Sequence, residues 1–233
     1  MSDTVNTVLI LFPWPSLGTA LVSELLGYDR RIYILLDDPQ AEYHYRGFLA
    51  SQQSRLNLIA LKDSAAAFCE QIDPVTVDTI SRAHVVINCI GHDFIRLQVE
   101  GESEDWRIRA SDAEQKRFAF LDLLLNHFRV TQKQIWINLV YGKAGHANEQ
   151  TFCDTRYGIV GFSSIMKMIP GLSGLLIRDV CLTFLRHRNQ PGRVGHCQRC
   201  SAEKFLNETP KLDKPGEIAK FLVQLSNSHI FES

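Results

Sequence analysis

The sequence predicts an α/β fold in which a single domain is built on a doubly wound parallel sheet. Apolar runs of strand length alternate with longer segments whose apolar residues recur at helical spacing, a pattern typical of right-handed βαβ units. With 233 residues, 45% of them hydrophobic, the chain can bury one sizeable core, and no shift in composition marks a domain boundary. We therefore expect residues 1–233 to form one domain whose sheet carries helices on both faces.

The predicted strands are apolar runs rich in β-branched residues, as expected where a parallel sheet is buried on both sides. They are residues 7–12, 31–38, 56–63, 83–91, 134–142 and 175–184. Helical spacing of apolar residues predicts helices over 17–25, from 64 onwards, and over 110–128, 155–169 and 215–225. Residues 186–214 are polar and contain two prolines, Pro191 and Pro210, and we expect a long loop or lid there.

Composition excludes several classes of partner. The net charge of −1 favours neither nucleic acid nor an anionic membrane, and no apolar run reaches the roughly 18 residues of a membrane span. The first residues are polar and lack the pattern of a secretion signal. The six cysteines are scattered through a chain with a full-sized core. We expect a reduced, cytoplasmic protein.

Four segments carry a resemblance to a known family. They are "NCIG" (88–91), "SEDWRIR" (103–109), "INLVYGKAGHANEQTFCDTRYGIVGFSSIMK" (137–167) and "KPGEIAKFLVQLSN" (214–227). In this order and spacing they resemble the short-chain dehydrogenase/reductase (SDR) family over nearly the whole chain. The resemblance implies a Rossmann-like domain and, in ordinary members, an oxidoreductase that uses NAD(P).

The family's catalytic side chains are missing at the matched positions. The tyrosine that exchanges the proton falls on Phe152, and the lysine that lowers its pKa falls on Arg156. The serine that polarises the substrate falls on Leu139, and the supporting asparagine falls on Ala113. Phe152 has no proton to give, and the guanidinium of Arg156 titrates too high for the lysine's role. The resemblance thus implies the fold without the usual dehydrogenase chemistry.

An atypical oxidoreductase is the alternative reading. Tyr141 or Tyr157 would then serve as the proton donor towards a small carbonyl or alcohol substrate, and Arg156 would hold the cofactor ribose. Neither tyrosine has a lysine four residues further on, because Gly145 and Gly161 stand there.

The predicted cofactor loop, "LFPWPSLG" (11–18), is also degenerate. The family's first glycine falls on Phe12 and its second on Ser16, so only Gly18 is kept. Two prolines remove backbone N–H donors from a loop that should bind a pyrophosphate. We expect Phe12 and Trp14 to fill the vacated cleft as additional core; the alternative is that Trp14 is exposed and docks a partner.

Some features still permit a dinucleotide. An aspartate at the end of the second strand, Asp37 or Asp38, could accept from a ribose hydroxyl, or it could simply cap the next turn. The expectation is that no cofactor binds. NAD(H), if any, would use Gly18, Asp37, Asp63, Asn88 and Gly91.

"HCQRC" (196–200) is a weak metal candidate. His196, Cys197 and Cys200 could contribute to a zinc site, but a second Cys-x-x-Cys pair is absent from the sequence. We expect no metal and a loop with incidental thiols; a metal-stabilised regulatory module is a minor alternative.

The leading hypothesis is a pseudoenzyme: an SDR fold retained for binding, regulation or scaffolding. Its partner would be another protein, a second copy of the chain, or a small ligand in the remodelled cleft. In the family, helices matching 110–128 and 155–169 form a dimer interface, so a homodimer is expected through them. Few residues follow position 225, so the family's last strand should be short or missing.

Overall fold

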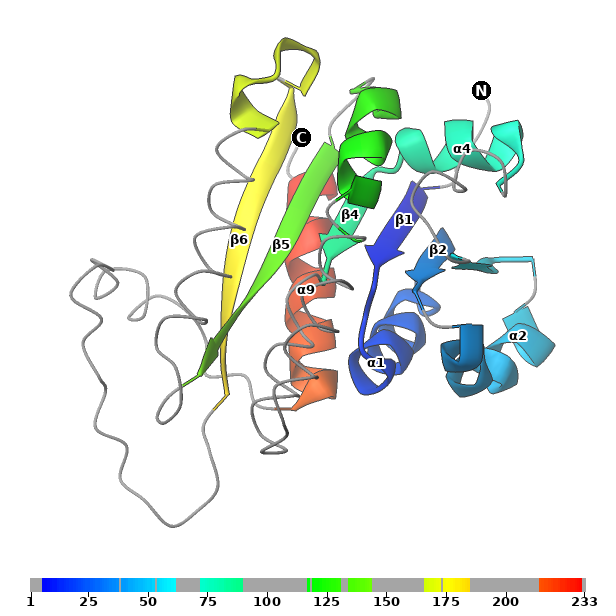
Figure 1. Cartoon of the computed structure of the whole chain (residues 1–233). Coiled ribbons are helices and arrows are strands. Elements are labelled where there is room, and N and C mark those ends of the chain that lie inside the picture. Colours follow the sequence, from blue (N-terminus) through cyan, green and yellow to red (C-terminus); the bar gives the residue numbers. More distant parts are fainter. Residues whose placement is uncertain are drawn as a thin grey trace, which may run out of the picture.

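The computed structural model describes residues 6–37, 39–52, 54–61, 72–89, 117, 119–130, 134–143, 166–172, 174–184 and 214–231. In these residues six parallel strands form one sheet in the order β3-β2-β1-β4-β5-β6 (Figure 1). The strands are β1 (Asn6–Leu11), β2 (Arg30–Leu36), β3 (Leu56–Ala60), β4 (Val85–Asn88), β5 (Gln134–Lys143) and β6 (Leu175–Phe184). The predicted doubly wound parallel sheet is confirmed.

The strand order reverses in the middle of the sheet. The chain runs from β1 outwards through β2 to β3, then returns to place β4 on the other side of β1. The two crossovers therefore diverge between β1 and β4, where doubly wound sheets leave a crevice at the carboxyl ends of the strands. This edge of the sheet positions the candidate site.

Helices α1 (Pro15–Leu25) and α9 (Pro215–Phe231) lie side by side on one face of the sheet (Figure 1). Residues at alternate positions of each strand point to this face, and Val8 and Ile10 of β1 are fully buried beneath the helices. The 3-10 helix η1 (Pro39–Tyr45) adds its last residue to the same apolar cluster.

The opposite face carries α4 (Pro74–Ser81) and the helix formed by residues 119–127. Leu9 and Leu11 of β1 point this way, as does Trp136 of β5, so each strand contributes to both layers. The sheet is thus buried on two sides, which explains why its strands are continuous apolar runs.

Three helices differ from the prediction. Helix α9 runs to Phe231 instead of ending at 225, and just beyond the predicted end the Ser226 hydroxyl accepts from Arg30 at 3.2 Å and donates to the Val223 carbonyl at 2.8 Å. Helix α2 (Arg46–Gln52) was not predicted, and α4 begins at Pro74 in a stretch where the predicted helix start is Ser64, which lies outside the described residues.

Helix α4 nevertheless begins with a clear sequence signal. The Asp73 side chain accepts from the Thr76 N–H at 2.9 Å, and Pro74 occupies the first turn. No helix in the described part of the chain is long and apolar enough to cross a membrane. The predicted lid, 186–214, lies outside the described residues except for Lys214.

Candidate functional site

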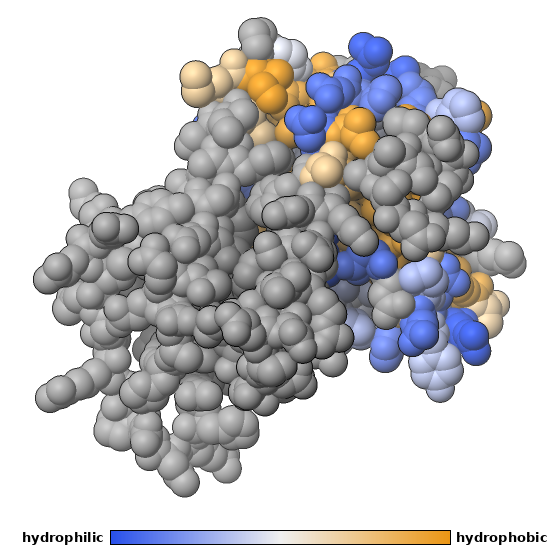
Figure 2. Space-filling model, in the orientation of Figure 1, coloured by the Kyte–Doolittle hydropathy of each residue, from blue (hydrophilic) through white to orange (hydrophobic). Residues whose placement is uncertain are grey.

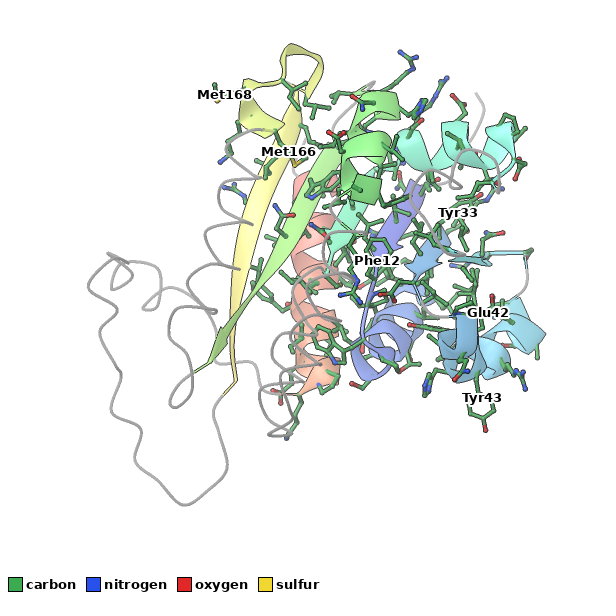
Figure 3. The ribbon with its side chains drawn as sticks, in the orientation of Figure 1. Phe12, Tyr33, Glu42, Tyr43, Met166 and Met168 are labelled. Atoms are coloured by element: carbon green, nitrogen blue, oxygen red, sulfur yellow. The ribbon has the colours of Figure 1, made fainter. Side chains whose placement is uncertain are left out.

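The candidate site is the edge of the sheet where β1, β2 and β4 end. Hydrogen bonding continues one residue beyond β1 and β4: the Phe12 N–H donates to the Leu35 carbonyl and the Cys89 N–H to the Leu11 carbonyl, each at 3.0 Å. The backbone N–H groups of Phe12 and Cys89 are therefore bonded to the ends of the neighbouring strands, and Figure 3 shows Phe12 beside the sheet. In doubly wound folds this is the edge that binds ligands.

Phe12 stands where the matched family pattern has its first glycine. Its φ is 52°, and no other non-glycine residue in the described ranges has a positive φ. This left-handed conformation costs about 1–2 kcal/mol for a residue with a Cβ. The ring is only 4% exposed and packs edge-to-face on Phe120, with centroids 5.6 Å apart and planes at 89°. The expectation that Phe12 joins the core is confirmed, while Trp14 is partly buried against the cluster on the opposite face.

Asp37, the predicted ribose acceptor, forms an ion pair with Arg117. The Arg117 Nε donates to Asp37 Oδ2 at 2.8 Å, and a second guanidinium nitrogen donates to the same oxygen. The arginine side chain is 7% exposed and the aspartate side chain 38%. The guanidinium carbon also lies 5.8 Å from the Phe12 ring centroid. Sequence reasoning missed Arg117, and both of its bonds go to one oxygen of the Asp37 carboxylate.

Gly18 faces the phenol ring of Tyr45. A Cβ built on Gly18 would lie 1.9 Å from the Tyr45 Oη and 3.1 Å from the Cγ of Pro13. Tyr45 comes from η1 and is fully buried. The glycine therefore accommodates a side chain of the protein itself, and Tyr45 is a second residue that sequence reasoning missed.

Two titratable groups at this edge are held neutral. Burial raises the pKa of Tyr45, and the nearby Cys89 raises it further. Burial also raises the pKa of the Cys89 thiol, which Arg117 opposes more weakly. Neither group is therefore an ionised nucleophile or base at neutral pH.

Asn88 belongs to a buried polar network between β4 and β5. Its amide donates to Asn138 Oδ1 at 2.9 Å, and the Trp136 indole N–H donates to the same oxygen at 2.8 Å. Asn88 and Asn138 are directly paired in register. The network ties the two strands together immediately behind the candidate site.

The remaining predicted residues divide into three groups. Leu139, matched to the catalytic serine, is fully buried in the cluster beneath α1 and α9. Tyr141 lies in β5 opposite Leu182, but its side chain is outside the described residues. Also outside them are Asp38, Asp63, Gly91, Ala113, Phe152, Arg156, Tyr157, His196, Cys197 and Cys200.

The described ranges contain no group of three or more His, Cys, Asp or Glu residues that could hold a metal ion. The metal candidates His196, Cys197 and Cys200 lie outside the described residues.

The site does not fit a dinucleotide bound in the usual way. Such a site needs bare glycine backbone and N–H donors around the pyrophosphate, with a strand-end carboxylate free for the ribose. Here a ring projects from the first glycine position, two prolines lack N–H groups, and Asp37 is paired. In this doubly wound α/β domain, the side chains of Phe12 and Arg117 are buried at the edge of the sheet where such folds bind ligands.

The fold is that of the short-chain dehydrogenase/reductases. No family model and no curated protein matches the sequence. Among solved structures, levodione reductase is similar with a TM-score of 0.61 and 16% identity, over 97% of this chain and 93% of that one.

Two further solved structures agree with this result. An SDR-family oxidoreductase from Burkholderia thailandensis gives a TM-score of 0.60 at 15% identity, over 98% and 89% of the two chains. A short-chain dehydrogenase from Streptomyces avermitilis gives 0.55 at 14%, over 96% and 84%. At such identities the likeness establishes the fold, and the predicted fold class is confirmed.

Proposed function

We propose that this SDR-fold protein acts by binding, as a regulatory or scaffold protein, without dehydrogenase activity and without NAD(P). The observation that supports the proposal is the occupation of the ligand edge by Phe12, Arg117 and Tyr45. All three are buried, and Phe12 stands at the position that the family pattern gives to its first glycine.

The energetic cost of clearing this edge supports the proposal. Exposing one fully buried aromatic side chain costs about 1.5–3 kcal/mol, so moving the rings of Phe12 and Tyr45 together costs about 3–6 kcal/mol. A ligand that had to displace both would bind roughly 10²- to 10⁴-fold more weakly than one entering an open cleft.

The missing functional groups support the loss of chemistry independently. Leu139 replaces a hydroxyl with a buried alkyl chain. In the sequence, Phe152 and Arg156 replace the proton donor and the residue that tunes it. A change at one position could be compensated locally, but these changes remove both the proton donor and the group that polarises the substrate.

The partner that we propose is a protein, in the first instance a second copy of the chain. The homodimer would use the helices predicted over 110–128 and 155–169. Met168, at the end of the second of these, is 80% exposed, whereas Met166 is buried against the sheet (Figure 3). Figure 2 shows apolar residues at the surface at this end of the molecule. An exposed methionine suits an adaptable protein contact.

Titration with NAD⁺, NADH, NADP⁺ and NADPH tests the cofactor part of the proposal. We expect neither a thermal shift nor a change in tryptophan fluorescence at millimolar concentration, with an active SDR enzyme as the positive control. A saturable shift with any of the four would refute the absence of cofactor binding. Turnover of a carbonyl or alcohol substrate, abolished by Tyr141→Phe or Tyr157→Phe, would instead establish the oxidoreductase alternative.

A further inference from the structure

The segment Pro39–Gln52, comprising η1 and α2, contacts α1, β2 and β3 and inserts one fully buried side chain into the core. The structure describes the whole segment, and Tyr45 is its only buried residue. Ala41, Phe48 and Leu49 are partly buried against the core, and the others are largely exposed. Figure 1 shows the segment at the outside of the molecule, beyond the end of β2.

The Tyr45 hydroxyl has no hydrogen-bond partner in the described part of the chain. It is fully buried, and its oxygen points at the face of α1 that Gly18 leaves bare. A buried polar group without a partner opposes burial, since it gives up its bonds to water. The free energy that holds Tyr45 in the core is therefore smaller than the apolar contacts of its ring alone would give.

On the other side of β1, Phe12 and Arg117 cover the candidate site in a different way from Tyr45. The Arg117 guanidinium is satisfied by Asp37 and lies over the Phe12 ring, so its polar atoms have partners when they are buried. Of the two closures, the one made by Tyr45 is the one that a local movement opens most readily.

Three uncharged residues adjoin the space that the Tyr45 ring fills, and the Arg117 guanidinium, which acts on Cys89, is neutralised by its ion pair with Asp37. Gly18 presents only its Cα, Pro13 contributes ring carbons, and Cys89 is a buried thiol close enough to Tyr45 to affect its titration. Burial keeps that thiol protonated by raising its pKa. The flat shape of the space follows from the ring that it now holds.

We propose that the segment Pro39–Gln52 is a latch: it swings outwards with Tyr45 and opens, beside Gly18, a slot that accepts a planar uncharged ring. This goes beyond the proposed function, because it names a movable element and the chemical class of ligand that its movement admits. The ligand would replace the ring of Tyr45 while the tyrosine hydroxyl gains water.

The latch is tested by the rate at which iodoacetamide alkylates Cys89 in the native protein, followed by mass spectrometry of the peptide that contains it. We expect alkylation in wild type through opening of the latch. Tyr45→Phe removes the unpartnered hydroxyl, favours the closed position and slows alkylation by about tenfold. Tyr33→Phe is the matched control: it makes the same change in the core of the opposite face and should leave the rate unchanged.

Two further readings separate the latch from unfolding of the whole protein. Opening of a short segment exposes little surface, so the alkylation rate should change little at low urea, and it should exceed the rate implied by amide exchange in β1. A rate that matches exchange in β1 and follows the full urea dependence would overturn the latch. So would an unchanged rate in Tyr45→Phe.

The slot is tested with phenol in the Tyr45→Ala variant. Phenol at millimolar concentration should raise the melting temperature of the variant, whereas benzoate, a ring of similar size with a charge, should not. If the variant folds poorly, its refolding yield is measured instead, and phenol but not benzoate should restore it. Equal effects of the two compounds, or no effect of either, would overturn the assignment of an uncharged slot.

Discussion

Replacing Phe12 by glycine and by alanine separates what its ring contributes from what its backbone conformation costs. Both substitutions remove a ring that is 4% exposed and packed on Phe120, and each should destabilise the protein by about 3–5 kcal/mol. They differ at the backbone, where φ is 52°. Alanine retains the left-handed cost of about 1–2 kcal/mol, which glycine avoids.

The greater freedom of glycine in the unfolded chain returns about 0.4–1 kcal/mol of that difference. Phe12→Gly should therefore be more stable than Phe12→Ala by roughly 0.5–1 kcal/mol. Urea unfolding at 25 °C, followed by tryptophan fluorescence and far-UV circular dichroism, measures the difference as a shift in midpoint at constant slope.

A matched pair at Leu21, a buried residue of α1, provides the control. In the middle of a helix the order is reversed, and Leu21→Ala should be more stable to unfolding than Leu21→Gly by about 1 kcal/mol. If Phe12→Ala proves as stable as Phe12→Gly, or more stable, then residue 12 does not adopt the left-handed conformation. The description of this loop as a glycine turn that carries a phenylalanine would then be wrong.

Three other predictions concern the same surfaces. Asp37→Asn should destabilise more than Arg117→Met, each by roughly 1–3 kcal/mol in urea unfolding, because the buried guanidinium cannot rehydrate whereas the 38%-exposed carboxylate can; the reverse order would show that the ion pair is not arranged as described. Because folding raises the pKa of Cys89, stability is fully present below about pH 8.5 and falls above it, since the unfolded chain then releases a proton that the folded one keeps. Between about pH 8.5 and 10, wild type should lose roughly 1.5 kcal/mol more of its stability than Cys89→Ala in total, and parallel pH profiles would contradict this. Met168→Glu should shift light-scattering mass towards the monomer, while Val75→Glu, at a similarly exposed apolar site on α4, should not; a monomeric wild type would reject the proposed dimer.

The fold could be predicted from the sequence because its main signals are local. Each strand of the parallel sheet is a continuous apolar run, and its alternate residues serve the two faces, as Leu9 and Ile10 show. The ends of elements were less predictable where tertiary contacts determine them. Helix α9 continues to Phe231 beside a hydrogen bond from Arg30 to Ser226, and these two residues are 196 positions apart in the sequence.

Residues of the candidate site could be predicted only where a family motif marks their position in the sequence. Phe12 and Gly18 could be located by matching the loop to the family pattern. The partner of Asp37 could not, because Arg117 is 80 positions away and nothing local distinguishes it from a solvated helix residue. Tyr45 was missed for a related reason: η1 and α2 were not predicted, so no element was available to bring that ring to Gly18.

The backbone at Phe12 also bears on the proposed loss of ligand binding. The left-handed turn persists without a glycine, and the N–H groups of Phe12 and Cys89 still donate across the ends of the strands. The turn therefore has a role in the sheet besides any role in ligand binding. That role would preserve the turn even if ligand binding no longer required it. If so, Phe12→Gly alone should not restore dinucleotide binding, because the prolines still lack N–H donors and Asp37 stays paired with Arg117. Saturable NADH binding by that single variant would show instead that the ring of Phe12 was the only obstacle at this edge.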